Sequence, residues 1–279
     1  MNSTSAKSER KPAVSLRGFR AAYGNRTVVE NLTFDVLAGE VFVIGGGSGC
    51  GKSTVLKHMI GLYAPAGGQI LIDGDDLAAA TGRERQRILR KIGVAFQGGA
   101  LFGNMSVLEN ICLPLSEFTN VDHSMAQMIA LAKLRLVGLE HAAQRLPSEL
   151  SGGMQKRAAI ARAMALDPAI IFLDEPSAGL DPITSADLDQ LILNLNRLLG
   201  MTFIVVTHEL PSLFTIADRV IVLDASVKTM VALDKPAALR DGSPNAWVRQ
   251  FFNREPTPDA PSAATPTSPA ATATTGRSP

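Results

Sequence analysis

Cysteine is scarce in this sequence: there are two among 279 residues, Cys50 and Cys112. Two cysteines are too few for a disulfide framework or a cysteine metal cluster, so we expect both to be reduced thiols in a cytoplasmic protein. Neither sign of charge is in excess, since 27 Lys and Arg face 26 Asp and Glu, and this balance argues against nucleic acid as an electrostatic partner. Long apolar runs are also lacking, because the stretch 169–173 (AIIFL) is far below the roughly 20 residues that cross a bilayer. The N-terminus carries charges with no apolar region after them, so we expect no secretory signal there.

Both ends of the chain differ in composition from its middle. Residues 1–13 are mostly polar, and the last stretch consists almost wholly of Pro, Ala, Ser and Thr. Such segments cannot bury enough apolar surface to offset the loss of chain entropy on folding. We therefore expect a flexible tail over 1–13, a folded domain over 14–252 and a disordered tail over 253–279, for which a tether or docking segment is the alternative.

Short β-rich runs alternate with helical stretches in the middle of the chain. The expected strands cover 14–23, 32–39, 40–45, 68–74, 92–97, 170–175, 203–208 and 219–224. The expected helices cover 52–62, 83–91, 154–166, 184–199 and 210–217. Near-continuous apolar strands that alternate with helices predict an α/β fold with a mainly parallel sheet covered on both faces. The early strands have a more antiparallel pattern, and residues 98–165 are expected to form an inserted helical subdomain.

A glycine-rich segment between an apolar strand and a helical run indicates phosphate binding. Residues 45–54 (GGGSGCGKST) contain the pattern G-x-x-x-x-G-K-S in the strand–loop–helix context of a P-loop. Glycines let backbone N–H groups approach phosphate oxygens, Lys52 would reach the β- and γ-phosphates of ATP, and the Ser53 hydroxyl would ligate Mg²⁺. The residues expected to bind the nucleotide are Gly46, Gly47, Ser48, Gly49, Cys50, Gly51, Lys52, Ser53 and Thr54. A glycine-rich turn without a ligand is the alternative.

Several of the expected strands end in side chains suited to hydrolysis. Asp174 and Glu175 close the run 170–175, and we expect Asp174 to bind Mg²⁺ and Glu175 to act as general base for the attacking water. His208 closes another apolar strand at the sheet edge where ligands bind, so we expect it to contact the γ-phosphate or that water. Gln97 would reach Mg²⁺ or water by the same logic. Solvated strand ends and a structural histidine are the alternatives.

A second candidate anion site begins at residues 150–163 (LSGGMQKRAAIARA). The start of a helix presents free N–H groups and the positive end of the helix dipole, which suits a phosphate. The order of all these motifs resembles the ATP-binding-cassette ATPases, which are P-loop NTPases with a RecA-like core, an antiparallel β subdomain and an inserted helical subdomain. The resemblance covers residues 14–252.

The resemblance assigns roles to further residues. In that family two domains pair head to tail, so Ser151, Gly152 and Gly153 would bind the γ-phosphate of ATP held by the partner's P-loop. Tyr23 matches the aromatic residue that stacks on adenine, with a packed or exposed loop tyrosine as the alternative. Asp181 matches the acidic residue of the loop that crosses the dimer interface. The family's usual Gln is Met154 here, which removes one polar contact.

Other stretches narrow the resemblance to the MlaF-like ATPases of MCE-type lipid transporters, the group that includes the Mla phospholipid system. These stretches are GGSGCGKST, LKHMIGLYAP, FQGGALFGNMSVLENICLPL, DEPSAGLDPITS and NAWVRQFF. The resemblance implies a homodimeric ATPase that drives phospholipid transport between inner and outer membranes from the cytoplasmic side of the inner membrane. Implied partners are a membrane permease, an MCE-domain substrate-binding protein and a small STAS-domain subunit. Two alternatives stay open: an importer of amino acids or other small solutes, and a non-transport protein of the same family that acts on ribosomes or DNA.

Overall fold

The computed structural model describes residues 10–255. Residues 1–9 and 256–279 hold most of the two predicted tails and lie outside the described part. The folded elements begin slightly before and end slightly after the predicted domain, since the first strand starts at Pro12 and the last helix ends at Asn253.

A six-stranded sheet forms the centre of the molecule, in the order β10-β9-β3-β8-β7-β6. Its strands are β3 (Val41–Gly46), β6 (Ile92–Ala95), β7 (Ile170–Asp174), β8 (Thr202–Val206), β9 (Arg219–Asp224) and β10 (Thr229–Asp234). All neighbouring pairs are parallel except β9 and β10, which are antiparallel. The prediction of an α/β fold with a mainly parallel sheet is confirmed.

A second sheet has the order β2-β1-β4-β5 and is antiparallel throughout, which confirms the early antiparallel pattern. Its strands are β1 (Pro12–Tyr23), β2 (Arg26–Leu37), β4 (Gly67–Ile72) and β5 (Asp75–Asp76). The predicted strand over 32–39 covers only the second half of β2. In the first half only Val29 is buried and the other residues are exposed or partly buried, so this half lacks the apolar run on which the prediction relied.

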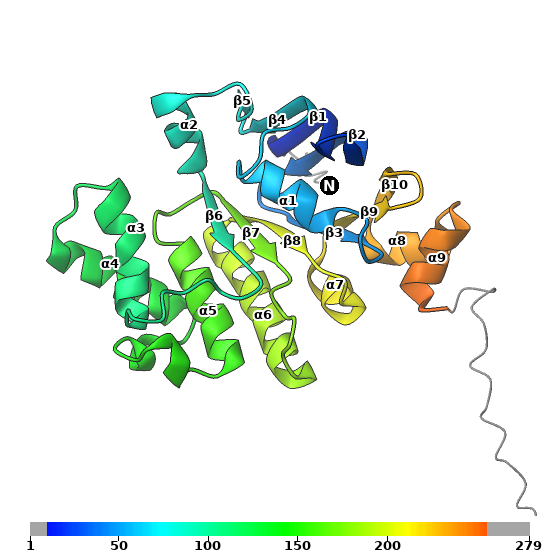
Figure 1. The fold of residues 1–279 in the computed structure, drawn as a ribbon. Helices are drawn as coiled ribbons and strands as arrows, with labels where there is room; N and C mark the ends of the chain where they lie inside the picture. The colour runs from blue at the N-terminus through cyan, green and yellow to red at the C-terminus, as the bar shows by residue number, and fades with distance from the viewer. Residues whose placement is uncertain (1–9, 256–279) are drawn as a thin grey trace, which may run out of the picture.

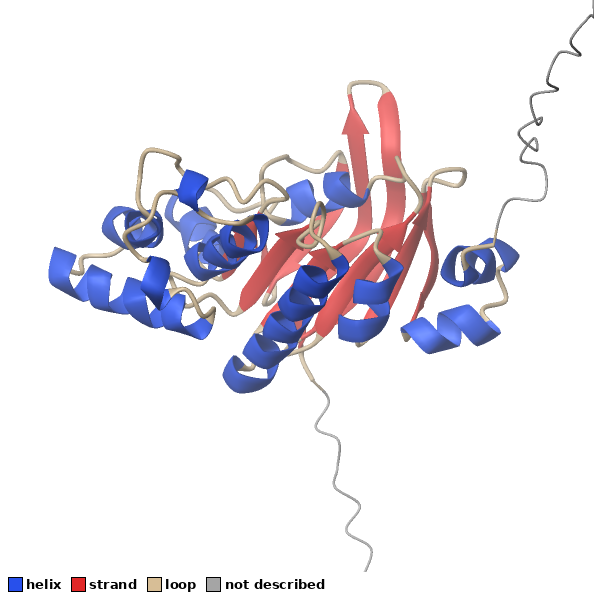
Figure 2. Ribbon diagram, turned by 90° about the horizontal axis from the view of Figure 1, so that it is seen from below, coloured by secondary structure: helices blue, strands red, loops and turns tan. Residues whose placement is uncertain are grey.

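Helices surround the parallel sheet, as Figures 1 and 2 show. They are α1 (Lys52–Met59), α2 (Gly82–Leu89), α3 (Val107–Phe118), α4 (His123–Leu136), α5 (Gly152–Ala163), α6 (Pro182–Leu199), α7 (Leu210–Ile216), α8 (Pro236–Gly242) and α9 (Ala246–Asn253). The helices α3, α4 and α5 lie at one end of the molecule, and α8 and α9 lie at the other (Figure 1). Within residues 10–255, no helix combines the length and the apolar character needed to cross a membrane.

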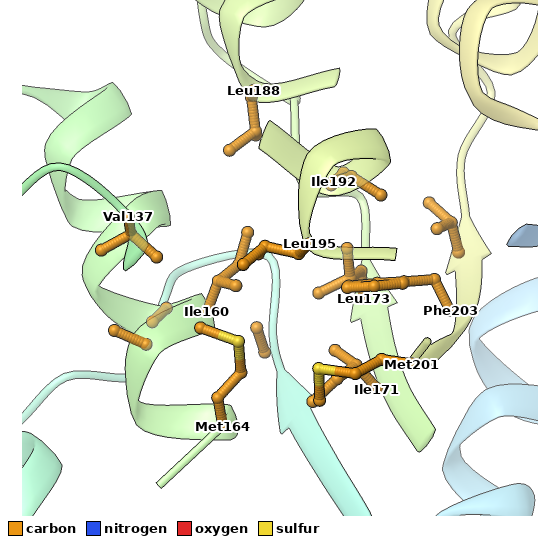
Figure 3. Packing of buried hydrophobic residues seen from close by; sticks show 14 of the residues in the cluster. Val137, Ile160, Met164, Ile171, Leu173, Leu188, Ile192, Leu195, Met201 and Phe203 are labelled. Carbon is orange, nitrogen blue, oxygen red and sulfur yellow. The ribbon is translucent and has the colours of Figure 1, made fainter. Parts of the chain in front are cut away.

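Apolar side chains fill both faces of the parallel sheet. On one face, α5 and α6 pack against β7 and β8 (Figure 3). The residues in this contact include Ile160, Met164, Ile171, Leu188, Ile192, Leu195 and Phe203. On the other face lies the antiparallel sheet, where the ring of Phe34 stacks on that of Phe42 with centres 5.4 Å apart. Removing these side chains from water is the main favourable contribution to folding. The same packing holds the two sheets and the helices in fixed relative positions, and with them the loops that follow the parallel strands.

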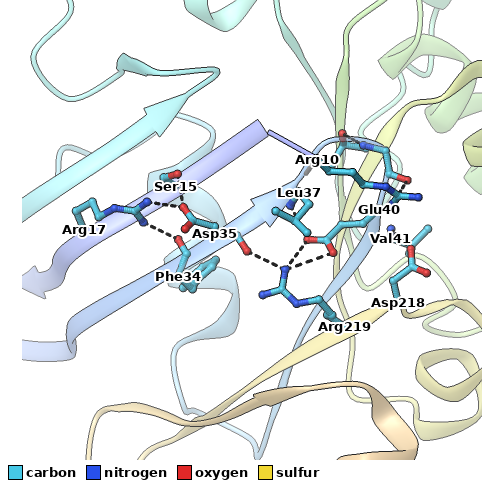
Figure 4. A network of polar contacts seen from close by, with 12 residues as sticks. Arg10, Ser15, Arg17, Phe34, Asp35, Leu37, Glu40, Val41, Asp218 and Arg219 are labelled. Atoms are coloured by element: carbon cyan, nitrogen blue, oxygen red, sulfur yellow. Dashed lines mark hydrogen bonds and ion pairs between the residues drawn. The ribbon is translucent and has the colours of Figure 1, made fainter. Parts of the chain in front are cut away.

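A buried polar contact also joins the two sheets (Figure 4). Glu40 is 2% exposed, and its Oε1 lies 3.2 Å from Nη1 of Arg219. The same Nη1 donates a hydrogen bond of 3.2 Å to the carbonyl of Asp35 in β2. Burial raises the pKa of Glu40, although Arg219 acts in the opposite direction. Arg219 therefore connects β9 to the antiparallel sheet, whose first hairpin borders the loop after β3.

Candidate functional site

The loop between β3 and α1 borders an open cavity of about 670 Å³, a size typical of ligand sites. The lining residues are Val28, Gly46, Gly47, Ser48, Gly49, Gly51, Lys52, Ser53, Thr54, Glu175, His208 and Phe251. The structure thus brings eight of the nine predicted P-loop residues to one cavity. The ninth, Cys50, is buried behind the loop, and burial raises the pKa of its thiol, which does not favour a reactive thiolate.

The path of this loop depends on glycine at Gly46. Its φ is 137°, and a Cβ there would lie 2.3 Å from the carbonyl oxygen of Leu223 in β9. Any larger residue would therefore push the loop away from the sheet. This close approach explains locally why the turn after β3 begins with glycine.

Lys52 holds this loop together from the first turn of α1. Its Nζ donates hydrogen bonds of 2.9 Å to the carbonyls of Gly46 and of Gly47. The side chain is buried at the base of the cavity, so phosphate oxygens could replace these two carbonyls without a large movement of the ammonium group. A cation so placed suits the β- and γ-phosphates of a nucleotide.

Ser53 and Asp174 are the oxygen donors predicted to bind a magnesium ion, and they lie side by side. Ser53 Oγ donates a hydrogen bond of 3.3 Å to Oδ1 of Asp174, which ends β7. Asp174 is 8% exposed, and burial raises its pKa, partly offset by the hydrogen bond from Ser53. A divalent cation would compensate this desolvated carboxylate, and hydroxyl and carboxylate oxygens fit Mg²⁺ together with phosphate and water. Residues 10–255 contain no group of three or more His, Cys, Asp or Glu that could hold a metal ion, so the protein ligands for Mg²⁺ would be few.

Glu175 and His208 meet at the rim of the cavity. Nδ1 of His208 donates to Oε1 of Glu175 at 2.8 Å, and the two residues follow the adjacent strands β7 and β8. The other carboxylate oxygen, Oε2, is buried and has no hydrogen-bond partner among residues 10–255. A buried acceptor without a partner is costly, and a water molecule held at Oε2 would satisfy it. Glu175 also has a left-handed backbone with φ 48°, a strained conformation often found at functional sites.

Asp174 and three other predicted site residues, Tyr23, Gln97 and Asp181, lie outside the lining of this cavity. Tyr23 ends β1, is 48% exposed and makes an edge contact with Tyr63 at 5.9 Å. Val28, which does line the cavity, lies on β2, the strand paired with β1 in the same hairpin. Gln97 lies two residues after β6, and its backbone carbonyl accepts a hydrogen bond from Lys156. Asp181 caps α6 by accepting from the N–H groups of Ile183 and Thr184 at 3.0 and 3.1 Å. The adenine, metal and interface roles stay predictions.

The segment 151–153 begins α5, away from the P-loop cavity of the same chain. Ser151 and Gly152 are exposed, and the Ser151 hydroxyl accepts a hydrogen bond of 3.3 Å from the N–H of Met154. Gly153 is buried, and a Cβ there would lie 2.4 Å from Cγ2 of Thr184 in α6, so the close packing of the two helices requires glycine. An exposed helix start of this kind is open to a ligand from outside the chain.

The cavity has one wall that the sequence analysis did not assign. Phe251 of α9 lines it, and a Cβ at Gly47 would lie 3.8 Å from Cζ2 of Trp247 on the same helix. The two rings stack on each other with centres 5.7 Å apart. Val28 of β2 also lines the cavity. The aromatic residues near the C-terminal end of the folded part were the only signal for α9, and they do not by themselves indicate which surface the helix covers.

The sequence matches the model of a family described as ABC transporter over residues 29–178. It is 41% identical over 241 residues to the probable ribonucleotide transport ATP-binding protein mkl of Mycobacterium leprae, an alignment that covers 86% of this chain and 69% of that protein. The chain spans 66% of the length of the mkl protein of Mycobacterium tuberculosis. It is 40% identical over 240 residues to the intermembrane phospholipid transport system ATP-binding protein MlaF of Escherichia coli K12, which covers 86% of this chain and 88% of that one.

Solved structures with the same fold are also ABC cassettes. The dimeric structure of MJ0796, a bacterial ABC transporter cassette, has a TM-score of 0.72 and 33% identity, and covers 80% of this chain and 98% of that one. The structure of cbiO1 from Clostridium perfringens, part of the ABC transporter complex cbiONQ, has a TM-score of 0.74 and 26% identity, and covers 81% of this chain and 89% of that one. A post-hydrolysis structure of MJ0796 is bound to ADP and Pi. These likenesses confirm the predicted P-loop fold class.

Proposed function

The chain belongs to the ABC transporter ATPase family, and from this premise we propose that it is the ATP-hydrolysing subunit of a phospholipid transporter. One observation carries the hydrolytic part. At the carboxyl ends of β3, β7 and β8, a buried lysine, a serine and a glutamate–histidine pair line one cavity, and the serine is hydrogen-bonded to Asp174 beside that lining. This arrangement combines phosphate binding, a metal site and a base for water.

In the proposed reaction, Lys52 exchanges its bonds to the loop carbonyls for bonds to the β- and γ-phosphates. Ser53 and Asp174 would hold Mg²⁺, which would neutralise charge on the phosphates. Glu175 accepts a proton from the attacking water at Oε2, the oxygen that lacks a partner among the described residues, while His208 holds Oε1 in place. The role of the base is thus assigned to one atom.

We also propose that two copies of the chain form the working unit. Residues 151–153 at the start of α5, of which Ser151 and Gly152 are exposed, lie outside the lining of the chain's own cavity, and they would contact the nucleotide bound to the second copy. The dimeric structure of the relative MJ0796 supports this assembly. ATP bound between the copies would favour the state in which they are in contact over the state in which they are apart. A ligand shifts such an equilibrium only as far as it binds one state better than the other.

Phospholipid is the proposed cargo because the aligned MlaF proteins are named for it. The Haemophilus influenzae MlaF protein is 44% identical over 195 residues, which cover 70% of this chain and 74% of that one. The proposed partners are a membrane permease, an MCE-domain protein and a small STAS-domain subunit, with the ATPase on the cytoplasmic face of the inner membrane. The segment around Gln97 to Leu113, at the head of the helical part, would be the region that contacts the permease.

The test is to tag the full chain in its native cells, solubilise membranes gently and identify the proteins and lipids that co-purify. The proposal expects a permease, an MCE-domain protein and bound phospholipid, together with ATPase activity. A permease for a small solute, or ribosomes without any membrane protein, would leave the family assignment standing and refute the proposed cargo.

Ribonucleotide transport is the second candidate, because the mkl proteins named for it align equally well. The purified complex in lipid vesicles separates the two. ATP-dependent transfer of labelled phospholipid out of the vesicles supports the first proposal, and uptake of labelled ribonucleotide without lipid transfer supports the second.

A further inference from the structure

Two cations of α5 bind the loops that carry the candidate catalytic residues. Lys156 donates to the carbonyl of Gln97 and lies 3.4 Å from the carbonyl of Glu175. Arg162 donates to the carbonyls of Ala100 and Gly99 at 2.7 and 3.1 Å. The helix α5 therefore contacts two parts of the chain. It binds both ends of the segment 97–100, which follows β6, and it approaches Glu175, which follows β7.

Both cations are partly buried, and across residues 10–255 neither forms an ion pair with a carboxylate. Burial lowers the pKa of Lys156, although the negative charges of Glu175, Glu209 and Asp174 oppose the shift. Burial likewise lowers the pKa of Arg162. The backbone carbonyls are thus the groups that compensate these desolvated charges, and such hydrogen bonds are among the strong ones.

The carbonyls come from backbone that needs support. Gly99 and Ala100 have φ values of 72° and 50°, and Glu175 has φ 48°. Residues other than glycine rarely adopt this left-handed conformation. Because Ala100 and Glu175 hold it with their carbonyls facing cations, the contacts from α5 are a reason why the loops keep these shapes.

The helix also lies close enough to β6 to move with it. A Cβ at Gly93 in β6 would lie 2.1 Å from the carbonyl oxygen of Ala163 at the end of α5. A Cβ at Gly99 would lie 3.7 Å from both Ala159 Cβ and the carbonyl oxygen of Gln155. The segment 97–100 therefore runs along the surface of α5, and a shift of the helix would shift the segment.

We propose that Lys156 and Arg162 are positioning residues that couple the start of α5 to Gln97 and Glu175 of the same chain. This inference rests on the proposed function, in which residues 151–153 contact the nucleotide of the second copy. A nucleotide at one site would then set the geometry of the base at the other site through a single helix. Lys156 is the closer of the two cations to Glu175, so it carries the test.

The experiment compares three variants of the full chain: Lys156→Met, Lys156→Arg and the matched control Lys133→Met. Lys133 lies on α4 and pairs with the carboxylate of Asp167, so its loss removes a charge in the same part of the fold without touching residues 97–100. ATP turnover is measured against ATP concentration to give kcat, KM and the Hill coefficient, and affinity is measured with a fluorescent ATP analogue.

For Lys156→Met we expect kcat to fall about tenfold, as for the loss of a charged hydrogen bond. Analogue affinity should stay within about twofold of wild type, because Lys156 does not line the cavity. The Hill coefficient should fall from above 1 to about 1. Lys156→Arg should restore most of kcat, and Lys133→Met should behave like wild type. A merely structural role would lower affinity and turnover together and would not separate them in this way.

Wild-type kcat and Hill coefficient in Lys156→Met would overturn the inference, and so would an equal loss in Lys133→Met. Amide hydrogen exchange gives a readout that does not need hydrolysis. In Lys156→Gln, which keeps a donor but no charge, the amides of 97–101 should exchange about tenfold faster than in wild type. Unchanged exchange of these amides would refute the proposed role of Lys156, whether or not the protein hydrolyses ATP. Absence of ATPase activity in the wild-type complex would instead refute the proposed function.

Discussion

Asp189 carries an ionisable group that the proposed reaction does not use, and its replacement gives a quantitative test of the structure. The residue lies on α6 between the core and α7 and is 4% exposed. Burial raises its pKa from 3.8 to about 6, a hydrogen bond from Ser212 opposes the shift, and the charge of Glu209 adds to it. At pH 7 the folded protein therefore holds a carboxylate whose charged form is disfavoured by its surroundings.

The free energy of this effect follows from the pKa. A difference of about 2 pKa units between the folded and unfolded chains corresponds to about 3 kcal/mol, at about 1.36 kcal/mol per unit. Between pH 4 and pH 6 the folded state binds more protons than the unfolded state, so the free energy of unfolding falls as pH rises. An asparagine side chain at this position cannot titrate and has nearly the same shape, so Asp189→Asn should stabilise the protein at pH 7 by up to about 3 kcal/mol.

The assay is urea unfolding of both proteins at several pH values from 4.5 to 8. The stabilisation should be largest above pH 7 and should shrink steadily toward pH 4.5. Asp187→Asn is the control on the same helix, because the side chain of Asp187 is 63% exposed and should show no such gain. If Asp189→Asn were no more stable than wild type at pH 7, or if its gain did not depend on pH, the assignment of a desolvated carboxylate would be refuted.

Three further predictions concern the cavity beside the loop between β3 and α1. Glu175→Gln should lower kcat about 10²–10⁴-fold, the usual contribution of a general base, with ATP still bound; phosphate release near the wild-type rate would contradict this. Lys52→Ala should weaken a fluorescent ATP analogue about 10–100-fold in a titration, because a charged hydrogen bond contributes about 1.5–3 kcal/mol, and unchanged affinity would exclude the P-loop role. Trp247 is the only tryptophan of the chain and lies against Gly47, so its fluorescence should change on addition of ATP and Mg²⁺ but not of buffer. A flat signal would mean that α9 does not adjoin the bound nucleotide.

The central strands could be predicted because their surroundings are simple. Buried parallel strands are covered on both faces, so β7 and β8 stand out as apolar runs, and polar residues stand at the end of β7 and directly after β8. The ends of the strands were predicted less accurately. The predicted strand 203–208 included His208, whereas β8 stops at Val206, two residues before it. The contact between His208 and Glu175 depends on the order of strands in the sheet, which hydrophobic patterns do not encode.

The C-terminal elements were not predicted. Residues of β10 are partly exposed almost throughout, because it is the edge strand, and so they form no apolar run. Helix α9 has eight residues, too few for a periodic pattern to be distinctive, and helices of this length depend on packing against the rest of the fold. Its place against Gly47 follows from the burial of Val248 and Phe252 in the core. That tertiary contact turns Phe251 into a wall of the cavity.

The start of α5 shows why a motif and its function need separate tests. Ser151 caps the helix and Gly153 allows the close approach to Thr184, so both residue types have local reasons to be there. A substitution at either position would disturb the helix whether or not a nucleotide binds. Gly152 is exposed, and a Cβ there would make only an ordinary contact of 3.4 Å with Leu180. Loss of ATP turnover in a bulkier variant such as Gly152→Val, with unchanged unfolding by urea, would therefore indicate a ligand at this helix start, whereas full activity would leave the segment with its structural role alone.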